Sequence, residues 1–137
     1  MKRFYLEFPG TVDSLYAVAE FVMEACEAVS TPLPRELISD LELVVSEAVT
    51  NAIRHGVRHE GDLLAVTMEI HDELITLRVD DHGPGFDLNA ISEPDLDQPA
   101  ESGYGIFVIK SLMDEVRYER RQECNRLLMV KRLGRAA

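Results

Sequence analysis

The chain has 137 residues, of which 46% are hydrophobic and 28% are charged, and its formal net charge is −11. These proportions are those of a soluble globular protein, so they argue against disorder and predict one domain over residues 1–137. The acidic excess repels phosphate backbones and anionic lipid headgroups, which argues against direct binding of nucleic acid or a membrane surface. No apolar run approaches the ~20 residues of a membrane span, and no signal peptide is recognisable, so we expect a cytoplasmic protein.

The N-terminal part predicts one strand followed by two helices. Residues 3–8 alternate polar and apolar side chains, which is typical of a half-buried strand. An apolar stripe at helical spacing predicts a helix over 13–29, for which Asp13 is a suitable N-cap. A second helix is predicted from about residue 34 to Gly56, a residue type that commonly ends helices.

The rest of the chain predicts two β-hairpins separated by a loop and a helix. The long loop over 86–103 has no helical period and, at this length, favours a functional lid. The order of elements predicts an α+β fold in which helices cover one face of a mostly antiparallel sheet, in two layers. The expected elements are strands 63–70 and 74–80, a helix over 104–113, and strands 116–120 and 126–132.

Glu47 and Asn51 lie one turn apart on the second predicted helix and project from the same face. Asn51 offers a neutral oxygen of the kind that Mg²⁺ accepts, and Glu47 is placed to take a proton during phosphoryl transfer. Taken alone, the pair is better explained as an ordinary solvated helix face.

A glycine-rich loop opened by Asp81, in the string DHGPG, follows a predicted strand. Gly83 and Gly85 allow the backbone to turn and approach a flat ligand, and the Asp81 carboxylate can accept the exocyclic amine of adenine. Guanine carries a carbonyl at that position and would be rejected. Taken alone, the loop is also compatible with a polar turn.

A second glycine pair, Gly103 and Gly105, comes just before an apolar helix. Free backbone N–H groups at such a helix start favour phosphate, although this pattern by itself is weak. The three elements together, in this order, predict a site for ATP and Mg²⁺.

These motifs resemble those of a known superfamily. SEAVTNAIRHG (46–56), DDHGPG (80–85) and SGYGIFVIKSLMDEV (102–116) are similar to the N, G1 and G2 boxes of the GHKL ATPases, and the chain most resembles the bacterial anti-sigma factor serine/threonine kinases. The resemblance implies the Bergerat ATP-binding sandwich, with Glu47 as the catalytic base and Asn51 as the ligand of Mg²⁺. The predicted cofactor-binding residues for ATP are Asn51, His55, Asp81, Gly83, Gly85, Gly103, Tyr104 and Gly105.

The same resemblance implies partners: a sigma factor, a STAS-type antagonist whose serine or threonine is phosphorylated, and a second copy of the chain. One feature departs from the family. Between Arg78 and Lys110 there is no lysine or arginine, and Glu101 stands where sporulation-type anti-sigma kinases carry an arginine. Because a cation near the transferring phosphoryl group raises the rate, a nucleotide-responsive binding module with weak or no kinase activity is the alternative hypothesis.

Two further classes fit less well. The catalytic part of a sensor histidine kinase needs a phosphoacceptor histidine on a dimerisation helix, and residues 11–34 contain none. The topoisomerase, chaperone and mismatch-repair branches require large transducer domains, for which 137 residues leave no room.

Overall fold

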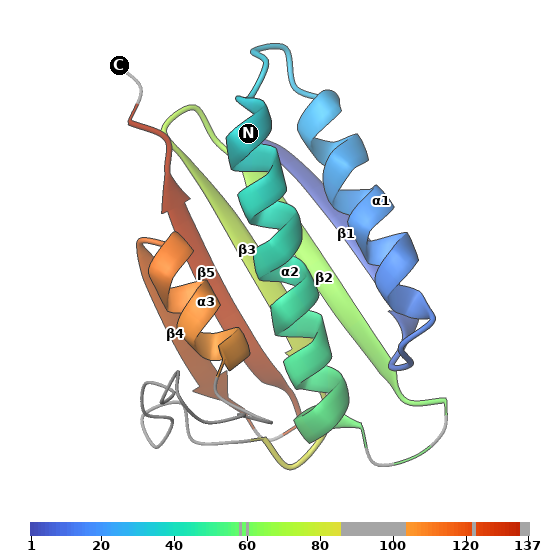
Figure 1. Cartoon of the computed structure of the whole chain (residues 1–137). Helices are drawn as coiled ribbons and strands as arrows, with labels where there is room; N and C mark the ends of the chain where they lie inside the picture. Colours follow the sequence, from blue (N-terminus) through green and yellow to red (C-terminus); the bar gives the residue numbers. More distant parts are fainter. Residues whose placement is uncertain (58, 60, 86–103, 122, 135–137) are drawn as a thin grey trace.

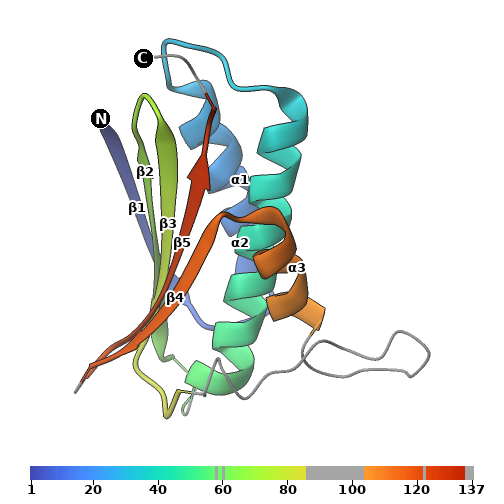
Figure 2. The same cartoon turned by 90° about the vertical axis from the view of Figure 1, so that its left-hand side faces the viewer.

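The computed structural model describes residues 1–57, 59, 61–85, 104–121 and 123–134. Its described strands form one five-stranded sheet in the order β1-β2-β3-β5-β4, and the described helices lie on one face of it (Figures 1 and 2). Every strand pair is antiparallel, so the predicted α+β sandwich is confirmed and its "mostly" antiparallel sheet is wholly so among the described strands. The elements are β1 (Lys2–Pro9), α1 (Ser14–Glu27), α2 (Arg35–Gly56), β2 (Leu63–Ile70), β3 (Leu74–Asp81), α3 (Tyr104–Leu112), β4 (Glu115–Arg120) and β5 (Asn125–Arg132).

The apolar core lies between the sheet and the helices. Side chains of β3 alternate strictly between buried and half-buried, as expected when one face of a strand packs on helices. Asp81, the last residue of β3, falls on the buried side of this alternation, directly opposite Asn125 of β5. The register therefore places a carboxylate at the edge of the core rather than in solvent.

Helix α2 crosses the sheet and is held by a continuous apolar stripe. Burial of each Leu or Val side chain stabilises the fold by about 1.5–3 kcal/mol, so a stripe of this length anchors the helix firmly. Polar residues on the adjoining stripe are thereby held in fixed positions. The buried residues of α2 are Leu41, Val44, Val45, Ala48, Val49, Ala52 and Gly56.

Two helix ends differ from the expected capping. Asp13 occupies the N-cap of α1 but makes no side-chain cap bond, and its backbone is already helical, with φ −60° and ψ −26°. Ser14 Oγ instead donates to the Pro9 carbonyl at 2.7 Å, which ties the helix start to the end of β1. Gly56 ends α2 without a left-handed backbone, and Val57 after it is extended. The small size of Gly56, described below, is what that position requires.

The two cysteines are free. Burial raises the pKa of the Cys26 thiol to about 11, and it also raises the pKa of the Cys124 thiol. Both side chains therefore stay protonated at neutral pH, as expected for thiols that only pack. Within the described residues, no helix is both long and apolar enough to cross a membrane.

Candidate functional site

Glu47 and Asn51 lie half-buried on α2, on the stripe next to its buried face. Among the described residues neither side chain has a hydrogen-bond partner, so their oxygens remain available to a ligand. An amide oxygen and a carboxylate one turn apart are hard donors of the type that Mg²⁺ binds, so this pair fits the predicted metal. His55 follows one turn later, half-buried in the last turn of the same helix.

The start of α3 lies against Glu47. A Cβ atom built on Gly105 would come within 2.8 Å of Glu47 Oε2, so the glycine lets the helix approach the carboxylate closely. Tyr104 is the first residue of α3, and the N–H groups of this first turn have no partner within the helix. The helix start therefore places a partial positive charge beside Glu47. Gly103 and Glu101 lie outside the described residues.

Asp81 is nearly enclosed, with 5% of its surface exposed. Its Oδ1 atom accepts two hydrogen bonds, from the Gly83 N–H at 3.0 Å and from Asn125 Nδ2 at 2.8 Å. Within the described residues, the other oxygen, Oδ2, accepts none. The carboxylate is thus fixed through one oxygen, while the second is left as an acceptor for a ligand.

The loop over 81–85 packs directly on the end of α2. A Cβ atom on Gly56 would lie 2.4 Å from Asp81 Cγ, and one on Gly83 would lie 2.4 Å from the Gly56 Cα. Both distances are far below van der Waals contact, so neither position tolerates a side chain without movement of the backbone or of Asp81. Two motifs that are far apart in the chain therefore meet at glycines.

The β4–β5 hairpin holds the other side of this loop. Gly85 has a positive φ of 77°, and a Cβ atom there would meet Arg120 Nε at 2.8 Å. Arg120 Nη2 donates to the Pro84 carbonyl at 2.6 Å, and the His82 ring is hydrogen-bonded to the Glu123 carbonyl. Sequence reasoning missed this support, because no motif marks the hairpin.

The structure thus brings the predicted residues into two groups joined by α2. Glu47 lies against Gly105 at the start of α3, with Asn51 one turn further along α2. Gly56, which follows His55, packs on Asp81 and Gly83. Asn125 and Arg120 are additions from the hairpin. Only the pairing of β3 with β5, which is not readable from local patterns, places Asn125 beside Asp81.

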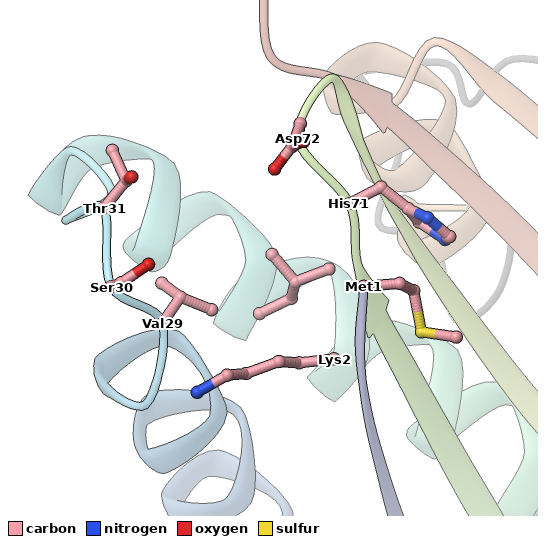
Figure 3. Close-up of a pocket in the computed structure, with 8 residues that line it drawn as sticks. Met1, Lys2, Val29, Ser30, Thr31, His71 and Asp72 are labelled. Carbon is pink, nitrogen blue, oxygen red and sulfur yellow. The ribbon is translucent and has the colours of Figure 1, made fainter.

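A separate cavity of about 160 Å³ lies at the opposite end of the sheet, between the α1–α2 connection and the β2–β3 turn (Figures 1 and 3). None of the predicted site residues lines it. Lys2 extends along this cavity, and its Nζ donates to the Ala28 carbonyl at 2.6 Å, where a cation favourably meets the end of α1. The contact stabilises that helix end and indicates no ligand.

A model of the histidine kinase-like ATPase domain matches residues 8–131. The chain belongs to this family. It is 37% identical over 91 residues to the serine-protein kinase RsbW of Listeria monocytogenes (strain EGD-e), an alignment that covers 60% of this chain and 58% of that protein. The RsbW kinase of Oceanobacillus iheyensis is 34% identical over the same length and coverage. The chain therefore spans less than two thirds of the length of these relatives.

Solved structures agree with the fold of this ATPase domain. The structure of the RsbU and RsbW domains of Rv1364c from Mycobacterium tuberculosis matches with a TM-score of 0.71 and 18% identity, covering 100% of this chain and 34% of that one. The Acinetobacter baumannii histidine kinase AdeS matches with a TM-score of 0.54 and 22% identity, covering 98% of this chain and 70% of that one. At these identities the likeness concerns the fold alone.

Replacement of Gly83 tests how closely the loop over 81–85 packs on the end of α2. Gly83→Ala is expected to lower the free energy of unfolding by about 1–3 kcal/mol or more, because its Cβ would overlap the Gly56 backbone. The control is Gly61→Ala, where φ is +93° but no atom lies within 4 Å, so only backbone strain of about 1 kcal/mol applies. Urea unfolding measures both variants. A smaller loss for Gly83→Ala than for Gly61→Ala would contradict the close packing.

Proposed function

We propose that this chain binds ATP and Mg²⁺ between α2, residues 81–85 and α3, and transfers the γ-phosphoryl group to a serine or threonine of a partner protein. The observation that carries the proposal is the buried Asp81, fixed through Oδ1 and open at Oδ2, on the same helix-lined side as Glu47 and Asn51. Membership of the histidine kinase-like ATPase family and the likeness to proteins named serine-protein kinase support it.

Each residue has a distinct role in this proposal. Asp81 Oδ2 accepts the exocyclic amine of adenine, and the N–H groups at the start of α3 receive the phosphates. Asn51 supplies an amide oxygen to Mg²⁺, which when bound neutralises charge on the phosphates. Glu47 takes the proton of the attacking serine or threonine hydroxyl. The hydroxyl oxygen bonds to the γ-phosphorus while the bond between the γ-phosphorus and the oxygen that links it to the β-phosphate breaks, leaving ADP.

Gly83 and Gly85 admit the nucleotide to the loop over 81–85, and Gly103, Tyr104 and Gly105 form the phosphate end of the site. His55 completes the nucleotide-binding set from the last turn of α2. Its position one turn beyond Asn51 supports this assignment. We assign it no metal-binding role.

The proposal extends to a partner-switching system. The chain would act as an anti-sigma factor, holding a sigma factor and phosphorylating its STAS-type antagonist, as a cytoplasmic homodimer of a single domain over residues 1–137. The relatives named RsbW support this assignment over part of the chain. The net charge of −11 disfavours direct contact with nucleic acid, so control of transcription would pass through proteins.

One observation favours a second candidate, a nucleotide-responsive module that sequesters a partner without phosphorylating it. No lysine or arginine lies between Arg78 and Lys110, so that stretch supplies no cation of its own for the phosphoryl group. Nucleotide would then act by binding one of two states more tightly. Arg120 does bring a guanidinium to the loop over 81–85, but that loop is the adenine end of the proposed site and not its phosphate end.

The test is transfer of label from γ-³²P-ATP to a purified STAS-type antagonist, followed by mass-spectrometric mapping of the phosphosite. We expect stoichiometric phosphorylation of one serine or threonine on the antagonist. Nucleotide-dependent capture of the antagonist with no label transferred would refute the kinase and support the sequestering module.

A further inference from the structure

Asn125 is the least exposed polar residue of the candidate site, with 4% of its surface accessible. It begins β5 directly opposite Asp81 of β3, and its side chain points to the same side of the sheet. It belongs to none of the motifs that predict the nucleotide site. Its contacts nevertheless concern the one carboxylate on which base recognition depends.

Both amide hydrogens of Asn125 are used in hydrogen bonds. Nδ2 donates to Asp81 Oδ1 at 2.8 Å and to the Gly83 carbonyl at 2.8 Å, which uses both amide hydrogens. Both partners are pure acceptors, so the network itself requires the amide nitrogen at this position. With the Gly83 N–H also donating to Oδ1, both lone-pair directions of that oxygen are occupied.

We propose that Asn125 is the positioning residue that makes the Asp81 carboxylate selective for adenine, an inference that rests on the proposed function and deepens it. By saturating Oδ1 and anchoring Gly83, Asn125 leaves Oδ2 as the acceptor that faces the base. A base with an exocyclic amine satisfies this buried oxygen. A base with a carbonyl at the same place leaves Oδ2 without a donor, and the two oxygens repel each other. A mismatch of this kind gives a large difference in affinity between the two bases.

Asn125 acts in this scheme through Asp81 and does not touch the nucleotide. Without its amide, the carboxylate keeps a single anchoring bond and can turn, so the direction of Oδ2 is no longer fixed. The ratio of affinities for two bases should then fall by a larger factor than the affinity that comes from the ribose and phosphates, which both nucleotides share. This difference separates a positioning role from general support of the sheet.

The experiment compares the dissociation constants of ATP and ITP, both with Mg²⁺, by titration calorimetry. ITP differs from ATP at the base position that Asp81 is proposed to read, where it carries a carbonyl in place of the amine. We expect the wild-type chain to prefer ATP at least about tenfold, and Asn125→Ala to lose most of that ratio, mainly through weaker ATP binding. If Asn125→Ala kept the wild-type ratio of the ATP and ITP dissociation constants, the inference would be overturned.

Two further variants guard against a simple folding defect. Asn125→Ser keeps a donor hydroxyl and should retain more of the ATP preference than alanine, whereas Asn125→Asp sets a second carboxylate against Asp81 and should bind ATP more weakly than alanine. Reversal of that order would count against the inference, even if one variant were unstable. Thr67→Val removes another buried polar group of the same sheet and should leave both affinities within about twofold.

The same titrations separate this inference from the proposed function. A wild-type chain that binds neither nucleotide would refute the nucleotide site itself. A wild-type chain that binds ATP and ITP equally would refute adenine recognition by Asp81. A selective wild-type chain whose selectivity survives in Asn125→Ala would refute the role of Asn125 alone.

Discussion

Glu47→Gln is expected to lower the rate of phosphoryl transfer by about 10²–10⁴-fold, because glutamine cannot accept the proton of the attacking hydroxyl. Affinity for ATP should change by less than about threefold, since the isosteric side chain still fits against Gly105 and the adenine contacts lie elsewhere. The measurement pairs single-turnover transfer from γ-³²P-ATP to the antagonist with calorimetry of ATP binding.

Glu36→Gln is the matched control for that experiment. Glu36 is exposed in the first turn of the same helix, so its replacement removes one negative charge from α2 far from the predicted base. Transfer by this variant should stay within about twofold of the wild-type rate. If Glu47→Gln transferred phosphate as fast as Glu36→Gln, Glu47 would not be the base.

Asp81→Asn is expected to weaken ATP binding by about 10²-fold or more while the loop keeps its shape. An asparagine amide has to present either its oxygen or its nitrogen to the donors of Gly83 and Asn125. If the oxygen faces those donors, the nitrogen faces the adenine amine, and two donors then oppose each other. The opposite orientation leaves the Gly83 and Asn125 donors unsatisfied, which costs about 1–3 kcal/mol for each buried group.

Asp80→Asn provides the neighbouring control. The Asp80 carboxylate is paired with Arg126 at 2.8 Å, and the strand alternation turns it to the face of the sheet opposite Asp81. Its replacement should reduce stability by weakening that pair and leave ATP affinity within about twofold. Calorimetry and urea unfolding of both variants measure the two effects. Equal losses of ATP affinity in the two variants would show that Asp81 has no special role.

The elements of the fold were largely predictable from local patterns. Strand 63–70 was expected with the bounds that β2 has, because a mostly apolar run ends at polar turns on both sides. The bounds of α2, Arg35–Gly56, likewise agree with the helix predicted from about residue 34 to Gly56. Gly56 was placed correctly at a helix end, but for the wrong reason: its size admits Asp81, and no left-handed cap forms.

Non-local pairing set the limit of sequence reasoning at the site. Asn125 and Arg120 reach the loop over 81–85 from about 40 residues away in the chain, as the hydrogen bonds to Asp81 and Pro84 show. That proximity depends on the register of β5 on β3, and no local pattern encodes it. A count of basic residues between Arg78 and Lys110 therefore could not show that β4 places the Arg120 guanidinium on this loop.

The most direct measurement is the titration of the wild-type chain with ATP and with GTP, each with and without Mg²⁺. We expect one ATP site per chain, binding that weakens when Mg²⁺ is removed, and a preference for ATP over GTP of at least about tenfold because Asp81 rejects a carbonyl. Absence of saturable ATP binding, or equal affinity for GTP, would contradict it.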